Sequence, residues 1–132
     1  MHRADTRPEP CPCGAQASYA VCCGRYLDEG LFPETAEALM RSRYVAYAQG
    51  RTDYLLQTWH PSTRPVALDL ENEPLRWLGL HVRRVEAGGP GATAGIVEFV
   101  ARYKVSGRAH RLHEVSRFVC EEGQWFYRDA QI

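Results

Sequence analysis

Four cysteines lie close together near the amino terminus of this 132-residue chain, and their spacing predicts a metal site. One proline separates Cys11 from Cys13, and Cys22 and Cys23 follow after eight further residues. Zinc prefers four soft ligands in a tetrahedron, so one structural ion could hold both ends of this short loop. Free thiols, vicinal disulfides and an iron–sulfur centre are the other interpretations. We expect zinc, because this segment has too few aliphatic residues to fold without a cross-link such as a bound metal ion.

A second set of polar residues falls at positions where the sequence pattern predicts burial. At 100° per residue, Arg43 lies between Met40 and Tyr47 on the apolar stripe of a predicted helix. Glu114 and Ser116 share one face of a predicted strand with apolar neighbours. Because a buried guanidinium needs a partner, we expect Arg43 to pair with Glu114.

The predicted pocket contains seven residues, which are Arg43, Tyr47, Trp59, His60, Arg64, Glu114 and Ser116. Two interpretations of this set stay open. In the structural one, the ion pair and its hydrogen bonds fix how helix and sheet dock. In the catalytic one, Glu114 abstracts a proton while Tyr47 or His60 stabilises the developing charge, so these three residues are the catalytic candidates. The sequence contains no nucleophile motif and no phosphate-binding glycine loop, which favours a protein that is not an enzyme.

Hydrophobic periodicity predicts the elements that must position these residues. Helical spacing of apolar residues predicts a helix over 35–49, and Thr52 is expected to cap a second short helix that ends near His60. Four extended segments separated by turns suited to hairpins then follow, at 77–87, 93–105, 110–120 and 124–129. The predicted fold class is α+β, with two helices covering the apolar face of an antiparallel meander.

The cysteine segment resembles a known zinc-binding module, the SEC-C motif. The similarity lies in Cys11-Pro12-Cys13-Gly14, Tyr19 and Cys22-Cys23-Gly24, and it implies that the four cysteines are the ligands of a structural Zn²⁺. Where SEC-C modules usually carry Ser-Gly and often basic residues, this chain has Ala15-Gln16-Ala17, a departure that argues against partner binding through a basic knuckle.

The rest of the chain resembles the YchJ family of uncharacterised bacterial proteins, through residues 35–44, 58–65 and 113–118. This resemblance implies an NTF2-like cone, in which helices pack into a curved antiparallel sheet of about four strands. It gives the expected domains, a SEC-C module over residues 1–30 and an NTF2-like domain over residues 31–132. It also implies a possible homodimer across the sheet.

Composition restricts the function classes further. Sixteen basic residues balance sixteen acidic ones, so the net charge of the chain is zero. The molecule as a whole therefore does not attract nucleic acid or an anionic membrane electrostatically. Lys104 is the single lysine, which nearly excludes Schiff-base chemistry. The sequence has no apolar run of the roughly 20 residues that a membrane-spanning helix needs, and residues 1–10 are polar, so we expect no signal peptide and a cytoplasmic location.

Three functions are compatible with these features. We expect a zinc-bearing binding or adaptor protein, not an enzyme, whose cone holds a small-molecule ligand or a protein partner. The first alternative is a small enzyme of the isomerase, dehydratase or hydrolase type that uses acid–base residues in the cone. The second is RNA or ribosome association through the zinc knuckle and the cationic hairpin that carries Arg102, Lys104, Arg108 and Arg111. A solvated surface is the simpler interpretation of this hairpin.

Overall fold

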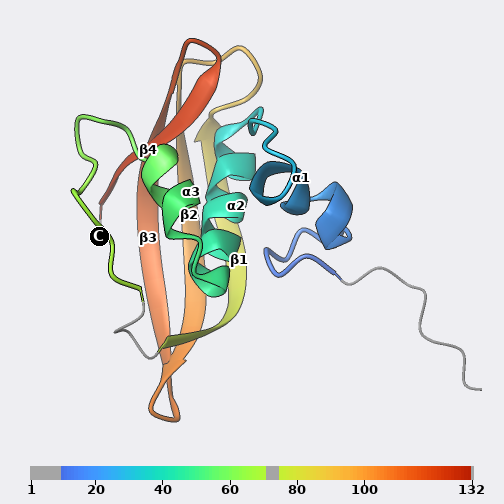
Figure 1. The fold of residues 1–132 in the computed structure, drawn as a ribbon, viewed down its shortest axis with the longest axis vertical. Coiled ribbons are helices and arrows are strands. Elements are labelled where there is room, and N and C mark those ends of the chain that lie inside the picture. The colour runs from blue at the N-terminus through green and yellow to red at the C-terminus, as the bar shows by residue number, and fades with distance from the viewer. Residues whose placement is uncertain (1–9, 71–74, 132) are drawn as a thin grey trace, which may run out of the picture.

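The computed structural model describes residues 10–70 and 75–131, which form two layers (Figure 1). One layer is a four-stranded antiparallel sheet in the order β1-β2-β3-β4, and the other consists of helices that lie across its concave face. The helical elements are η1 (Tyr19–Val21), α1 (Gly24–Leu27), α2 (Ala36–Gln49) and α3 (Thr52–Gln57). The strands are β1 (Leu75–Ala87), β2 (Ala94–Val105), β3 (Arg108–Glu121) and β4 (Gln124–Gln131). The predicted α+β class, with helices packed against an antiparallel sheet of four strands, is confirmed.

Helix α2 is the main element of the helical layer, and its two ends have defined caps. Thr35 Oγ1 accepts a hydrogen bond from the Ala38 amide at 3.0 Å, which satisfies one of the free N–H groups of the first turn. Gly50 ends the helix with a φ of 71°, a left-handed conformation that glycine adopts without strain. The predicted cap at Thr52 is wrong, because α3 follows so closely that Arg51 is the N-cap and Thr52 is already helical.

The sheet has one face toward the helices and one face toward solvent. Strands β2 and β3 pair without interruption, so Phe99 lies opposite Glu114 and Val97 lies opposite Ser116. Partners in an antiparallel ladder point to the same face, which here is the concave one. Val97, Phe99 and Ala101 are the buried residues that β2 places on this concave face. Strand β1 contains two irregularities, between Trp77 and Gly79 and between Val82 and Arg84, which the alternation did not predict.

A close backbone contact fixes the start of α2 on the β1–β2 turn. The Ala36 amide donates to the Gly88 carbonyl at 3.0 Å. A Cβ on Gly88 would stand 2.9 Å from the Ala36 side chain, and one on Gly95 would stand 2.6 Å from the Gly88 Cα. These positions therefore require glycine, because any side chain would push the helix off the sheet.

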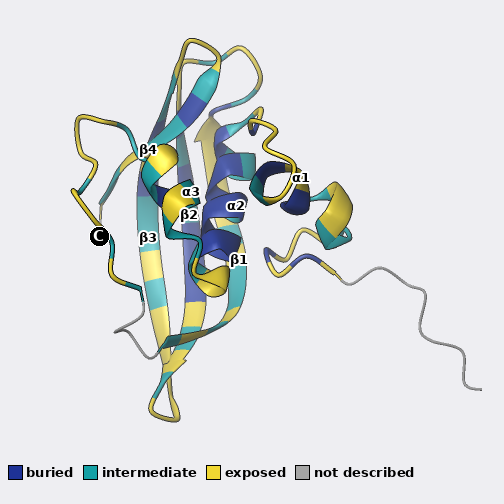
Figure 2. Cartoon of the chain, in the orientation of Figure 1, coloured by how far each residue is buried: buried dark blue, intermediate teal, exposed yellow. Residues whose placement is uncertain are grey.

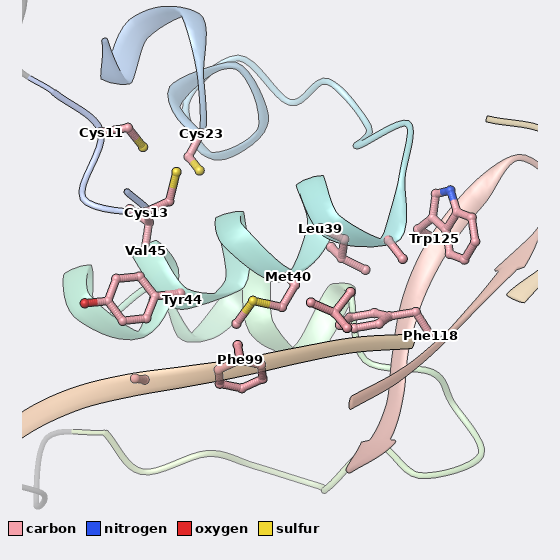
Figure 3. Packing of buried hydrophobic residues seen from close by; sticks show 13 residues of the cluster. Cys11, Cys13, Cys23, Leu39, Met40, Tyr44, Val45, Phe99, Phe118 and Trp125 are labelled. Carbon is pink, nitrogen blue, oxygen red and sulfur yellow. The ribbon is translucent and has the colours of Figure 1, made fainter. Parts of the chain in front are cut away.

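One hydrophobic core extends from the sheet through α2 into the cysteine segment. Buried residues concentrate on α2 and the middle of β2 (Figure 2), and the close view shows Met40 packed between α2 and Phe99 (Figure 3). Cys11, Cys13 and Cys23 belong to the same buried cluster on the opposite side of α2. The amino-terminal segment thus has no separate core, which agrees with its low aliphatic content.

The predicted absence of a signal peptide concerns residues 1–9, which lie outside the described residues together with 71–74 and 132. Among the helices of the described part, we find none with the length and apolar character needed to cross a bilayer.

Candidate functional site

Four cysteine sulfurs converge beside α2 and form a candidate metal centre. The Sγ atoms of Cys11, Cys13, Cys22 and Cys23 all lie within 4.8 Å of one another, and those of Cys13 and Cys22 are 3.6 Å apart. In a tetrahedral zinc site with Zn–S distances of about 2.3 Å, the sulfurs stand about 3.8 Å apart. All four thiols are free of disulfides. The cluster therefore has the donor set and the spacing of a closed four-sulfur site that could hold a metal ion.

The acidity of these thiols follows from their crowding. The hydrogen bond from Cys23 lowers the pKa of Cys13 to about 5. Burial raises the pKa of Cys22 to about 11, and the hydrogen bond to Cys13 raises the pKa of Cys23. The neighbouring thiols thus stabilise one thiolate, while a cation at the centre would displace the remaining protons.

Contacts with α2 and β1 hold the cysteine cluster against the larger layer. Arg41 Nη1 of α2 donates to the Cys13 carbonyl at 2.7 Å, and Arg41 Nε donates to Glu37 Oε2 at 2.9 Å. Gly14 has a φ of 82°, and a Cβ there would stand 3.0 Å from the Leu80 carbonyl oxygen of β1. Only glycine allows this turn to approach the strand so closely.

A cavity of about 590 Å³ lies between α2 and the concave face of the sheet. Its wall is mostly aromatic and aliphatic, with contributions from α2, the segment after α3 and all four strands. The lining residues are Met40, Arg43, Tyr44, Tyr47, Trp59, Leu75, Trp77, Phe99, Ala101, Tyr103, Val105, Leu112, Glu114, Ser116, Phe118 and Tyr127. A concave, largely apolar pocket with few polar groups is the usual form of a small-molecule site.

The structure brings five of the seven predicted pocket residues to this cavity, namely Arg43, Tyr47, Trp59, Glu114 and Ser116. His60 and Arg64 do not line it. The His60 Nε2 atom lies 3.0 Å from a carboxylate oxygen of Glu121, near the β3–β4 turn. Arg64 is exposed, and its Nε donates to the Trp59 carbonyl at 2.9 Å. The imidazole and Glu114 therefore do not meet in one cavity, and of the two residues predicted to assist Glu114 it is Tyr47 that lines the same cavity.

The Arg43 side chain is buried between α2, α3 and β4. It is 5% exposed, and its Nη1 donates to the Leu55 carbonyl at 2.8 Å and to Thr58 Oγ1 at 2.7 Å. Its guanidinium carbon lies 5.1 Å from the ring centre of Trp59 and 4.6 Å from that of Tyr127. Burial lowers the pKa of Arg43 to about 10, so the group stays charged at neutral pH. Hydrogen bonds and cation–π contacts take the place of the expected carboxylate.

Glu114 stands in the cavity wall without a cation beside it. It is partly buried on β3, and it makes no hydrogen bond or ion pair with any residue of the described ranges. The predicted pairing of Arg43 with Glu114 is therefore wrong, because the guanidinium is turned toward the end of α3. Burial raises the pKa of Glu114. Burial, together with the charge of Glu114, also raises the pKa of Tyr127 to about 12.

Two residues contribute more to the cavity region than the sequence indicated. Tyr127 and Thr58 are not among the seven predicted pocket residues. A parallel bridge joins Trp59 to Tyr127, with the Tyr127 amide donating to the Thr58 carbonyl at 2.8 Å. The available signal was the two-residue spacing between Trp125 and Tyr127, which places both rings on one strand face. Nothing in the sequence marks Thr58 as the acceptor of a buried arginine.

Comparison with protein families matches both parts of the chain. The family model described as YchJ, middle NTF2-like domain matches residues 35–130, and the SEC-C motif matches residues 7–25. A UPF0225 protein from Chromobacterium violaceum is 58% identical over 120 residues, which are 89% of this chain and 88% of that protein. A UPF0225 protein from Methylibium petroleiphilum is 55% identical over 125 residues, covering 95% of this chain and 90% of that one.

Two solved structures share the fold. The solution structure of a SEC-C motif containing protein from Rhodopseudomonas palustris has a TM-score of 0.82 at 34% identity, covering 92% of this chain and 97% of that one. The crystal structure of a SEC-C motif containing protein from Psychrobacter arcticus has a TM-score of 0.71 at 26% identity, covering 92% of this chain and 81% of that one. With both family models and close relatives in agreement, the chain belongs to the YchJ (UPF0225) family, with a SEC-C motif before its NTF2-like domain.

Proposed function

We propose that this protein is a zinc-stabilised binding protein whose NTF2-like cavity holds a small organic molecule, and that it is not an enzyme. The observation that carries the proposal is the cavity of about 590 Å³ between α2 and the sheet, with its mainly aromatic and aliphatic wall. A volume in this range accommodates a ligand of drug-like size, and an apolar wall provides the burial that drives its binding.

The polar groups of the wall indicate which ligand chemistry fits. Arg43 already has protein partners, and Ser116 is 2% exposed, so neither is free to bind strongly. Glu114 has no hydrogen-bonding partner in the described part of the chain. An aromatic compound with one amine would bury its rings against Trp77 and Tyr103 and place the ammonium group at Glu114.

Acid–base catalysis receives less support from the same geometry. Glu114 has a raised pKa from burial, as a general acid or base often does. A second titrating group near neutral pH would be required, and His60 lies outside the cavity against Glu121. The tyrosine beside Glu114, Tyr127, has its pKa raised to about 12, away from the working range of a general base.

We propose further that the metal held by the four cysteines is Zn²⁺ and that its role is structural. Four sulfur donors leave no open coordination position for substrate. The buried location of Cys11, Cys13 and Cys23 in the shared core supports a stabilising role. Free thiols at all five cysteines support a reducing compartment such as the cytoplasm.

Calorimetric titration with matched probe pairs tests the binding role. Each pair consists of an aromatic amine and the alcohol of the same carbon skeleton, so that the two differ only in charge. We expect some pairs to bind with micromolar affinity. In these pairs the amine should bind about tenfold more tightly than the alcohol, because Glu114 is ionised above its pKa and attracts the ammonium group. Leu112→Trp, which fills the cavity, should abolish binding, whereas Ala109→Trp on the exposed side of the same strand should leave it unchanged.

The outcomes separate the two parts of this proposal. Binding of no probe, or binding that Leu112→Trp does not affect, would reject the cavity as a ligand site. Equal binding of amine and alcohol, unchanged in Glu114→Gln, would leave the cavity as a binding site and reject the role of Glu114.

A further inference from the structure

We call the face of the sheet that points away from α2 the outer face. Its acidic residues lie toward one end of the strands, and its unpaired basic residues lie toward the other end. Its acidic residues are Glu86, Glu98 and Asp129, and each is paired with a basic neighbour. Glu98 accepts from Arg84 at 3.0 Å and lies 2.7 Å from His113, while Asp129 accepts from Arg117 at 2.6 Å. These pairs occupy the half of the sheet near the β1–β2 turn, which they make locally neutral.

The other half of the outer face, near the β2–β3 hairpin, is basic. Arg83, Arg102, Lys104 and Arg111 are exposed there, and none of them has an ion pair within the described residues. The strands therefore present positive charge at one end only, although the net charge of the chain is zero. A local field of this kind attracts anions even where the molecule as a whole does not.

An open depression of about 460 Å³ lies within this basic half. We name it the arginine notch and define it by Leu78, Gly79, His81, Arg83, Arg102 and Arg111, with Val100 in its wall. Gly79 creates the space, because it lies opposite Arg102 in the β1–β2 ladder and a Cβ there would meet nothing within 4 Å. The notch thus combines guanidinium groups with an apolar surface.

The pairing of strands places two arginines of the notch side by side. Arg102 of β2 lies directly opposite Arg111 of β3 in an uninterrupted antiparallel register. Like charges at directly opposed positions destabilise a sheet, and packing does not require them at exposed sites. An anion between the two guanidinium groups would remove this repulsion, and arginine forks match the oxygens of a phosphate in a bidentate manner.

We propose that the arginine notch binds the phosphate backbone of single-stranded nucleic acid. The basic side chains continue along β2 from Arg102 to Lys104, and residues two apart on a strand face are about 6.8 Å apart, so the site extends beyond one phosphate. The exposed Leu78 side chain and the guanidinium planes provide surfaces on which an unpaired base can stack. An acidic peptide would leave this apolar surface unused. The proposal is independent of the cavity, which opens on the opposite face.

Fluorescence anisotropy with a labelled single-stranded RNA of about 12 nucleotides tests the proposal, a length within the range that such sites cover. The wild-type protein should bind, and the affinity should fall as the salt concentration rises from 50 to 300 mM. In Arg102→Gln/Arg111→Gln, the slope of log K against log salt should decrease in size by about 1.4, because each single-strand phosphate contact contributes about 0.7. The same relation gives a loss of about 25-fold at 0.1 M salt.

Arg117→Gln is the matched control, because Arg117 lies on the same face and strand but is already neutralised by Asp129. It should retain wild-type affinity and salt slope. Leu112→Trp should also bind RNA normally, which separates this site from the cavity. Circular dichroism and thermal melting check that each variant is folded before its affinity is compared.

Three outcomes would overturn the proposal. The first is the absence of salt-dependent RNA binding by the wild-type protein. The second is an equal loss in Arg117→Gln and in the double variant, which would indicate a diffuse charge effect. The third is competition by polyglutamate as effective as that by unlabelled RNA of equal charge, which would assign the notch to acidic proteins instead. If the first outcome is found and the protein binds inorganic phosphate, the notch is a single-anion site and has no nucleic-acid role.

Discussion

At the scale of single residues, Glu114 is a partly buried carboxylate that no cation of the described residues neutralises. Burial in the cavity wall raises its pKa, so the folded state disfavours the ionised carboxylate relative to the unfolded chain. The stability that this group contributes is therefore fully present below its unfolded pKa and is lost as the pH rises through its folded pKa. The wild-type protein should consequently lose stability between acidic and neutral pH on account of Glu114.

Glu114→Gln should remove this pH dependence, because the amide does not ionise. We expect the variant to gain about 1 kcal/mol in the free energy of unfolding at pH 8 and nothing at pH 4, since only the charged form is costly to bury. Urea unfolding at both pH values measures the difference. Glu122→Gln, at an exposed turn position, serves as the control. An equal effect of Glu114→Gln at both pH values would contradict the assignment.

Arg43 differs from Glu114 because its buried charge is already satisfied. Arg43→Lys keeps the charge but loses the planar fork that bonds the Leu55 carbonyl and Thr58 Oγ1, as well as the stacking on Trp59 and Tyr127. We expect a loss of about 2 kcal/mol in the free energy of unfolding, measured by urea titration. The exposed Arg128→Lys should change it by less than about 0.5 kcal/mol. Similar stability of Arg43→Lys and wild type would show that these contacts contribute little.

At the scale of elements, the cap of α2 provides a test of how the helical layer begins. Thr35→Ala removes the bond to the Ala38 amide and should cost about 1 kcal/mol of stability in urea unfolding. Thr52→Ala is the matched control, because Thr52 makes no capping bond in the structure although the sequence suggested one. A larger loss in Thr52→Ala than in Thr35→Ala would contradict the observed caps.

The sequence predicted the elements better than the contacts between them. Apolar periodicity was sufficient for α2, and turn residues were sufficient to separate the four strands, because both signals are local in the sequence. The partner of Arg43 could not be predicted, since it depends on where the end of α3 lies relative to α2. The position of His60 depends on long-range bonds, from its amide to the Tyr127 carbonyl at 2.7 Å and from its Nε2 to Glu121 at 3.0 Å, which no local pattern encodes. The bulges of β1 likewise depend on tertiary packing.

At the scale of the whole molecule, the cysteine cluster and the cone share one core, so metal loss should affect both. Elemental analysis of the purified protein should find one zinc ion per chain, and chelation should lower the melting temperature of the entire molecule in one transition. Cys13→Ser should reproduce this destabilisation with loss of zinc, because Cys13 is completely buried in the cluster. Cys120→Ser, outside the cluster, should retain the metal. Full stability in the absence of metal would contradict a structural role.

The predicted homodimer across the sheet stays a prediction, and the charge distribution restricts its geometry. Two copies that met through the basic half of the outer face would place Arg102 and Arg111 against the same residues of a partner. Such a contact is unfavourable without an intervening anion. Any dimer is therefore expected to use the neutral half, near Glu98 and Asp129.

Helix α2 separates two sites and contacts both. Arg41 on one side donates to the carbonyl of the metal-binding loop at Cys13, and Arg43 and Tyr47 on another side face the cavity. If both proposed sites are occupied and one occupant tilts α2, the affinity of each site changes with occupation of the other by the same factor. On the proposed functions, zinc limitation would then change the fraction of this protein that holds its ligand.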